Sequence, residues 1–127
     1  MSVIQEIKEK LGKHPELAFE LESNSISVLP DNGFTVWLTE NGNSYTVGYD
    51  GWHEEFNSKE EALNCFSFGL SSECRLKIHK FGNSPYKWVV QYREAGEWLN
   101  DSTTGLIFVP FWRPRNIVYL QNAVINS

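Results

Sequence analysis

The sequence predicts an α+β fold: an antiparallel meander sheet of six or more strands, with two or three helices packed mainly on one face. Three observations lead to this class. Runs of alternating apolar residues flank tight turns, two segments repeat apolar residues at helical spacing, and 127 residues suit a single domain over 1–127. Apolar residues make up 41% of the chain and charged residues 21%, a balance that excludes a disordered chain and permits an ordinary hydrophobic core.

Two helices are predicted because a capping box precedes apolar residues at helical spacing. The first helix extends from about Ser2 to Lys13, and the second begins after Ser58. In each, the capping serine is followed three residues later by a side chain that suits a capping box, Gln5 or Glu61. The apolar stripe of the second helix consists of Ala62, Leu63, Phe66 and Leu70.

Asn41-Gly42 lies between two runs of alternating apolar residues, which is the strongest short-range signal for a β-hairpin. With Asn41-Gly42 at the tip, the expected cross-strand pairs are Leu38 with Tyr45, Val36 with Val47, and Phe34 with Tyr49. All six side chains then lie on one face of the sheet, as a half-buried hairpin requires. Residues 18–22 and 25–29 carry weaker signals for two short strands before this hairpin.

A second tight turn, Asp50-Gly51, leads into a third strand over residues 52–56. A two-residue turn there places Glu54 on the apolar face, opposite Val47. Either a bulge rotates the strand, or Glu54 is an inward charge that guards a sheet edge.

The second half of the chain follows a similar plan. The apolar faces match if Cys74 pairs with Tyr92, Leu76 with Val90, and Ile78 with Trp88, which needs an odd number of loop residues. The two halves, about 34–70 and 74–125, suggest a weak internal repeat of about 43 residues with three strands and a helix in each unit. The alternative is that hairpins simply resemble one another.

The last part of the chain carries a mixed signal. Residues 106–109 form a continuous apolar run, typical of a buried strand. Asn116 suits the N-cap of a final helix, whereas Ile117, Val118 and Tyr119 suit a strand equally well. The choice between helix and strand stays open.

Charge is unevenly distributed along the chain. Residues 1–70 hold 12 acidic and 4 basic residues, a net charge of −8, whereas residues 71–127 hold 4 acidic and 7 basic residues, a net charge of +3. The longest apolar run is far shorter than the roughly 20 residues of a membrane helix, and the N-terminus lacks the features of a signal peptide. We therefore expect a cytoplasmic protein with no membrane association, in which Cys65 and Cys74 are reduced core residues.

The first candidate site lies on the outward face of the predicted hairpin sheet. There Trp37, His53 and Glu55 share one face, and Glu54 is their neighbour on the same strand. An imidazole, a carboxylate and an aromatic ring can bind a polar ligand or transfer a proton. The alternative is a solvated face on which Trp37 covers Gly48. No motif predicts a catalytic nucleophile, a metal site or a cofactor site.

The second candidate site is basic and aromatic. Arg75, Lys77, Arg93 and Trp98 share the outward face of the later strands, and Arg93 is expected to lie opposite Trp98. Such a set can bind an anion or single-stranded nucleic acid. A cation–π pair that only stabilises the fold is the alternative. The net charge of −5 makes a general nucleic-acid binder unusual, so nucleic acid is not the expected partner.

These features favour a small non-enzymatic binding protein, although they leave catalysis open. Its acidic, aromatic-bearing surface would contact a basic protein partner, as an inhibitor or immunity-type protein does. One alternative is a small-molecule-binding or weakly catalytic domain that uses Trp37, His53 and Glu55. A further alternative is single-stranded nucleic-acid binding through the basic second half. Self-association into a homo-oligomer stays open.

Overall fold

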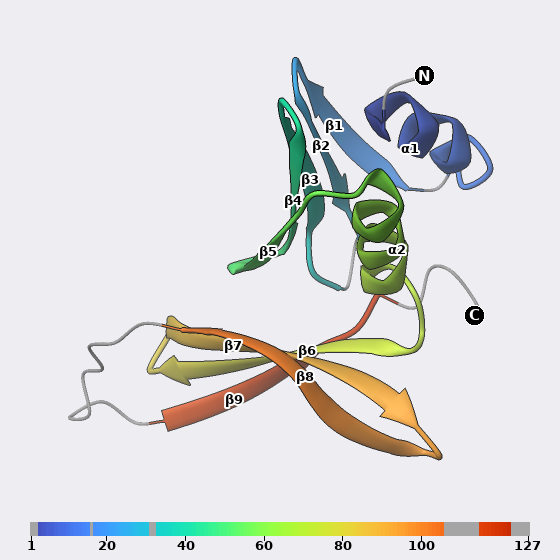
Figure 1. Cartoon of the computed structure of the whole chain (residues 1–127). Helices are drawn as coiled ribbons and strands as arrows, with labels where there is room; N and C mark the ends of the chain where they lie inside the picture. Colours follow the sequence, from blue (N-terminus) through green and yellow to red (C-terminus); the bar gives the residue numbers. More distant parts are fainter. Residues whose placement is uncertain (1–2, 16, 31–32, 106–114, 123–127) are drawn as a thin grey trace.

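The computed structural model describes residues 3–15, 17–30, 33–105 and 115–122, which contain two helices and nine strands. The first sheet has the order β1-β2-β3-β4-β5 and the second the order β8-β7-β6-β9. The first sheet comprises β1 (Ala18–Glu22), β2 (Ser25–Leu29), β3 (Val36–Asn41), β4 (Ser44–Tyr49) and β5 (Trp52–Phe56). The second comprises β6 (Cys74–Phe81), β7 (Ser84–Glu94), β8 (Glu97–Gly105) and β9 (Arg115–Leu120). Helices α1 (Val3–Leu11) and α2 (Lys59–Gly69) lie on the same side of the five-stranded sheet (Figure 1).

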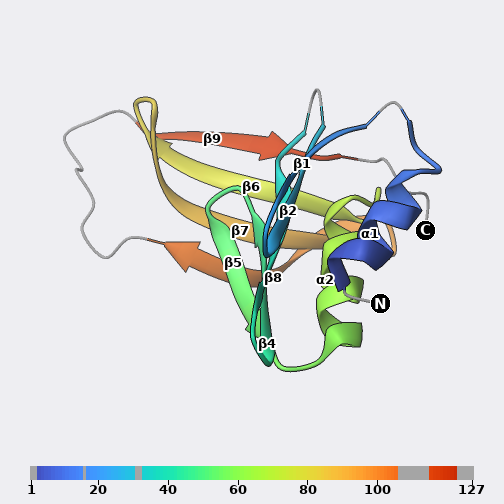
Figure 2. The same cartoon turned by 90° about the horizontal axis from the view of Figure 1, so that it is seen from above.

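The α+β class with antiparallel strands is confirmed, but the expectation of one sheet with six or more strands is wrong. The described strands form two antiparallel sheets, of five and four strands. Helix α2 separates the two meanders in sequence, and β6 pairs with β7 and β9 instead of extending the first sheet at β5. The strands of the two sheets run in crossing directions (Figures 1 and 2).

The two helices form where apolar spacing predicts them, whereas Ser2, the expected cap of the first helix, lies outside the described residues. The Ser58 side chain accepts a hydrogen bond from the backbone amide of Glu61 at 3.3 Å, which caps the start of α2. In α2 the buried residues are Ala62, Phe66 and Gly69, and Leu70 follows them. In α1 the buried residues Val3, Ile7 and Leu11 recur every four positions, so one stripe of the helix faces the core.

The β3–β4 hairpin forms, but its register differs from the expectation by two residues. Leu38 pairs with Val47 and not with Tyr45, and Asn41 pairs with Ser44 across a turn of Gly42 and Asn43. Gly42 has a φ of 73°, whereas Asn43 is not in the positive-φ region. This is the pattern of a type II′ turn, which needs glycine at its first central position. Because a shift of two preserves the side-chain alternation, the predicted apolar face is unchanged.

The other predicted registers are confirmed. Tyr49 pairs with Trp52 and Val47 with Glu54 across the Asp50-Gly51 turn. In the second sheet the pairs are Cys74–Tyr92, Leu76–Val90 and Ile78–Trp88, as the apolar faces require. The turn itself joins Phe81 to Ser84, and a register shift between His79 and Lys80 supplies the odd residue. A β-bulge therefore reconciles a two-residue turn with the apolar alternation.

The final described segment is a strand. Strand β9 pairs antiparallel with β6, and its Val118 lies opposite Ile78 on the apolar side. The predicted strand over 106–109 lies outside the described residues. The single-domain assignment and the internal repeat stay predictions. Strands β3–β5 and β6–β8 each form a three-stranded meander. The next element is helix α2 after the first meander and strand β9 after the second.

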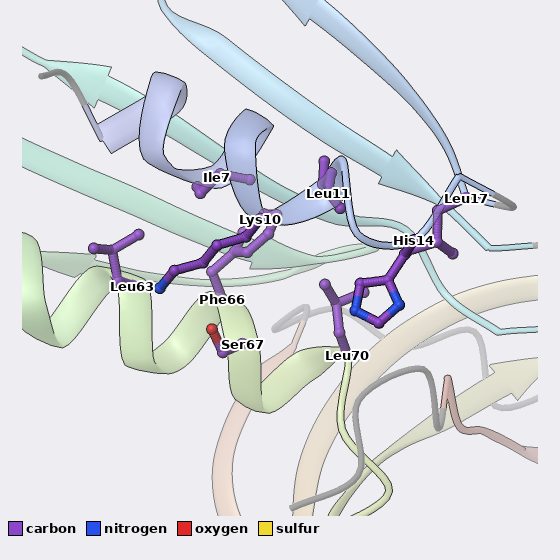
Figure 3. A pocket seen from close by; sticks show the side chains of 9 residues that line it. All are labelled: Ile7, Lys10, Leu11, His14, Leu17, Leu63, Phe66, Ser67 and Leu70. Atoms are coloured by element: carbon purple, nitrogen blue, oxygen red, sulfur yellow. The ribbon is translucent and has the colours of Figure 1, made fainter.

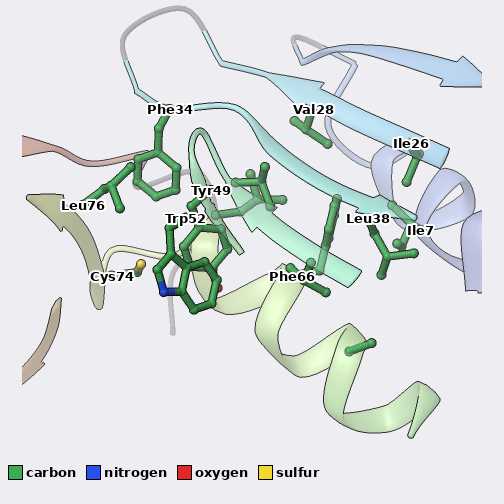
Figure 4. Packing of buried hydrophobic residues seen from close by; sticks show 14 of the residues in the cluster. Ile7, Ile26, Val28, Phe34, Leu38, Tyr49, Trp52, Phe66, Cys74 and Leu76 are labelled. Atoms are coloured by element: carbon green, nitrogen blue, oxygen red, sulfur yellow. The ribbon is translucent and has the colours of Figure 1, made fainter. Parts of the chain in front are cut away.

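One hydrophobic cluster extends from both helices through the first sheet to strands β6 and β7. At its centre the ring of Tyr49 stacks on Trp52 with centroids 4.6 Å apart and contacts Phe34 at 5.4 Å (Figure 4). Leu76 and Cys74 of β6 lie beside these rings and are fully buried (Figure 4). The aromatic residues thus occupy the junction between the two sheets.

Candidate functional site

The outward face of the five-stranded sheet brings Trp37 and His53 to the two sides of Gly48. Trp37 pairs with Gly48, which in turn pairs with His53 on edge strand β5. The indole ring lies directly over Gly48, where a Cβ would overlap the ring. The pairing of Trp37 with Gly48 follows from the two-residue shift of the β3–β4 register.

Trp37 is held in place by the β4–β5 turn. Its Nε1 donates a hydrogen bond to the Asp50 carbonyl at 3.2 Å. The Asp50 carboxylate accepts a hydrogen bond from the Thr35 amide at 3.0 Å, and burial raises the pKa of this carboxyl. These contacts stabilise the turn, so Trp37 is a half-buried structural residue, whereas His53 is exposed to solvent.

Glu54 and Glu55 lie on opposite faces of β5. Glu55 pairs with Thr46 and shares the outward face with His53. Glu54 lies on the face of α2, close enough to Cys65 to raise the pKa of its thiol, after the larger effect of burial. Glu54 remains exposed because β5 is an edge strand, which matches the interpretation as a charge at a sheet edge.

Four exposed carboxylates lie close together in sequence, on edge strand β5 and in the first turn of α2. We define the acidic edge as Glu54, Glu55, Glu60 and Glu61, all of them exposed. The one cation in this stretch of sequence, Lys59, forms an ion pair with Glu6 at 3.0 Å. Its charge is therefore balanced by α1 rather than by the acidic edge.

The four-stranded sheet brings together all four residues of the basic and aromatic candidate site. The Arg75 guanidinium lies 4.5 Å from the ring centroid of Trp98 and 4.2 Å from that of Tyr119. Arg93 lies 4.7 Å from the Trp98 centroid, and Lys77 lies 6.0 Å from that of Tyr119. We refer to these five residues as the basic–aromatic cluster.

Sequence reasoning missed Tyr119 because the last segment was compatible with a helix. The strand signal of residues 117–119 could have placed it, since an antiparallel partner for β6 puts Tyr119 opposite Lys77.

Sequence reasoning also missed the series of side-chain hydrogen bonds that holds Arg75 in the cluster. Arg75 donates through Nε to Gln91 at 2.8 Å, and Gln91 donates to Asn100 at 2.8 Å. With a side chain only 5% exposed, Gln91 fixes the orientation of the guanidinium.

A small apolar pocket of about 50 Å³ lies between α1 and α2 (Figure 3). Its walls include Ile7, Leu11, Phe66 and Leu70, and the polar ends of Lys10 and His14 lie near it (Figure 3). None of the predicted site residues lines it. Its volume has room for about one water molecule and not for a drug-sized ligand.

The two cysteines are core residues of the junction. Burial raises the pKa of the Cys65 thiol to about 12 and raises that of Cys74 further. The Tyr49 hydroxyl donates to the Cys65 carbonyl and lies 3.3 Å from the Cys65 sulfur.

Within the described ranges, no three His, Cys, Asp or Glu side chains are grouped to hold a metal ion. No helix in those ranges is both long and apolar enough to cross a membrane.

Comparison of the chain with protein-family models, with curated proteins and with solved structures gave no match. The function is therefore inferred from the residues themselves.

Proposed function

We propose that the chain is a non-enzymatic binding protein that uses its acidic edge to contact a basic protein partner, in the manner of an inhibitor or immunity-type protein. The supporting observation is that edge strand β5 and the first turn of α2 carry four carboxylates, each of them exposed. The surface lies at the end of the sheet order, where the backbone of β5 has a neighbouring strand on one side only.

Charge and backbone contribute differently to this surface. The carboxylates attract a positively charged partner and raise its association rate. The part of the β5 backbone that lies outside the ladder with β4 can hydrogen-bond an extended segment of that partner, a recurrent mode of recognition. His53 and Trp37 add aromatic area on the adjoining outward face, where Trp37 is already fixed by Asp50. In this proposal these groups bind and orient a partner and do not catalyse a reaction.

The small-molecule alternative is less well supported. His53 and Glu55 are exposed on an edge strand, and the pocket between α1 and α2 is lined neither by them nor by Trp37. Proton transfer by such groups needs a site from which water is excluded.

The experiment is a pull-down from the native host with two charge-reversal variants. In the first, Glu54→Lys is combined with Glu55→Lys on edge strand β5. In the matched control, Glu20→Lys is combined with Glu22→Lys on edge strand β1, which is exposed along its whole length. Both variants change the net charge by the same amount, so a general electrostatic effect alters both equally.

We expect the wild type and the β1 control to retain the same basic protein, and the β5 variant to lose it. Equal retention by all three proteins would contradict the acidic edge as the binding surface. Equal loss of that protein by both variants would show that binding depends on net charge alone, which would also contradict the acidic edge as the binding surface.

A further inference from the structure

Within the bounds of strands β6 to β9, the outer face of the four-stranded sheet carries no acidic side chain at any position that the structure describes, and Glu73 lies directly before β6, opposite Arg93. The register defines this face, because the opposite face holds Cys74, Leu76, Ile78 and Val90 in the core. Its described positions include Arg75, Lys77, His79, Lys87, Val89, Gln91, Arg93, Trp98, Asn100, Thr103, Ile117 and Tyr119. In a chain with a net charge of −5, this is a marked segregation of positive charge.

The cations on this face form a row along the strand direction. Arg75 and Lys77 are two residues apart on β6, and the Arg93 amide donates to the carbonyl of Glu73, one step further in the same direction. Two residues of a strand span roughly 7 Å, so the three charges follow one another at that spacing. None of them forms an ion pair with a carboxylate among the described residues.

The aromatic rings lie on either side of Arg75. Trp98 pairs with Arg93 and Tyr119 pairs with Lys77, so the rings flank Arg75 diagonally. Tyr119 is 48% exposed and neighbouring Ile117 49% exposed, which leaves apolar surface open to solvent beside the charges. The Gln91–Asn100 chain holds the Arg75 guanidinium between the two rings. The positive charge is therefore fixed before any ligand arrives.

The electrostatic environment of His79 agrees with this arrangement. Its pKa is lowered, first by burial and then by the positive charges of Lys77 and Lys87. The charged groups that affect the pKa of this ring are thus cations. The row therefore continues beyond Lys77 to Lys87, which pairs with His79.

From this geometry we infer that the outer face of the four-stranded sheet binds a short stretch of single-stranded nucleic acid. The backbone phosphates of an extended strand repeat on the scale of the cation row, and unpaired bases can stack on an exposed ring such as Tyr119. An isolated phosphate would use one cation and leave the others unpaired. An acidic peptide would use the charges but not the rings. The site lies on a different sheet from the acidic edge and does not depend on the proposed function.

Binding is tested by fluorescence anisotropy with labelled 12-nucleotide single-stranded DNA and RNA at several salt concentrations. The charge variant combines Lys77→Glu with Arg93→Glu and leaves Arg75, which is hydrogen-bonded to Gln91, in place. Its matched control combines Lys8→Glu with Lys13→Glu, two exposed lysines of the α1 region with the same change in net charge. Tyr119→Ala removes a ring, and Tyr119→Phe retains it. Circular dichroism and urea denaturation establish that each variant is folded.

We expect micromolar binding at 50 mM salt for the wild type, the lysine control and Tyr119→Phe. Three phosphate contacts predict a slope of about −2 in log K against log salt for a single strand. The charge variant should lose at least tenfold in affinity, with a shallower slope. Tyr119→Ala should lose roughly tenfold, since a stacked base contributes on that scale.

Several outcomes would overturn the inference. One is absence of binding to either oligonucleotide at 50 mM salt. Another is equal affinity for an oligoglutamate peptide or for duplex DNA, which would indicate that charge alone is recognised. Equal losses in the charge variant and the lysine control would place the binding elsewhere. The Glu54→Lys, Glu55→Lys variant should bind the oligonucleotide at least as tightly as the wild type, so failure here is separate from failure of the proposed function.

Discussion

The indole ring of Trp88 lies against Gly51, so strand β7 of the second sheet contacts the β4–β5 turn of the first. A Cβ at position 51 would overlap the ring. Gly51 does not adopt a positive φ, so the backbone conformation alone does not require glycine there. Close packing between the two sheets is the reason that this position lacks a side chain.

Replacing Gly51 with valine should therefore destabilise the fold through Trp88. We expect the free energy of unfolding to fall by about 1–3 kcal/mol, the usual cost of forcing extra atoms into a packed site. Urea denaturation measures the change. In a Trp88→Leu background the same substitution should cost clearly less, because the smaller side chain leaves room. An equal cost in both backgrounds would show that the ring is not the obstacle.

Asn122 connects the end of α2 to the start of β3. Its Nδ2 donates to the Gly69 carbonyl at 2.9 Å, and its Oδ1 accepts from the Phe34 amide at 2.9 Å. Asn122→Ala should reduce stability by about 1–3 kcal/mol, because two partly buried backbone groups lose their partner. Asn116 makes an exposed hydrogen bond to the Gly82 carbonyl, so Asn116→Ala should change stability by no more than about 0.5 kcal/mol. Equal effects of the two substitutions in thermal or urea unfolding would contradict the bridging role.

Stability should fall as the pH rises above about 8.5, the ordinary pKa of an unfolded thiol. Burial raises the pKa of the Cys65 thiol to about 12, and the pKa values of Cys74 and the Tyr49 phenol also rise on folding. The unfolded chain therefore releases these protons first, and above that pH it binds fewer protons than the folded chain, which favours unfolding. The stability that these protonated, buried groups contribute is fully present below about pH 8.5 and is lost as the pH approaches 12.

Urea denaturation between pH 7.5 and pH 10 tests this linkage. The decline should be shallower in Cys74→Ala, since one linked group is gone and each contributes at most about 1.4 kcal/mol per pH unit. Cys74→Ala starts from a lower stability because it also leaves a small cavity, so the slope and not the absolute value is compared. A stability that rises between pH 8.5 and pH 10 would contradict the burial of these groups.

The tip of the β3–β4 hairpin distinguishes two central positions. Gly42 has a φ of 73°, so Gly42→Ala should cost roughly 1 kcal/mol in backbone strain although no neighbouring atom obstructs the added Cβ. Asn43 lacks a positive φ, and Asn43→Ala should have little effect. Equal sensitivity of both positions to alanine in urea denaturation would favour a type I′ turn and contradict the type II′ assignment.

The sequence predicted local structure well where side-chain alternation and turn chemistry agree. The pairs Cys74–Tyr92 and Tyr49–Trp52 follow from keeping apolar residues on one face. The hairpin register at Leu38 was wrong because Asn-Gly suits a type I′ turn, whereas glycine in the first central position of Gly42-Asn43 suits a type II′ turn. Both registers bury the same residues, so burial could not distinguish them.

The division into two sheets could not be predicted from local patterns. Whether β6 adds to β5 or starts a new sheet depends on packing between distant residues, such as Trp88 against Gly51. Local patterns also could not assign Tyr119 to the candidate site, because its position beside Arg75 depends on the long-range pairing of β9 with β6. In contrast, Arg93 and Trp98 were found because β7 and β8 are joined by a short turn that fixes their register. Arg75 was found because the β6–β7 hairpin is also formed by neighbouring strands in the sequence.

The salt dependence of association with the basic partner tests the proposed function most directly. Exposed charges are screened beyond about 8 Å at physiological ionic strength, so a partner attracted by the acidic edge should bind more slowly as salt rises. In stopped-flow or surface measurements, the association rate of the wild type should fall at least fivefold between 50 and 300 mM salt, with little change in the dissociation rate. The Glu54→Lys, Glu55→Lys variant should associate slowly at every salt concentration. An association rate that is independent of salt, and equal in wild type and variant, would contradict recognition through the acidic edge.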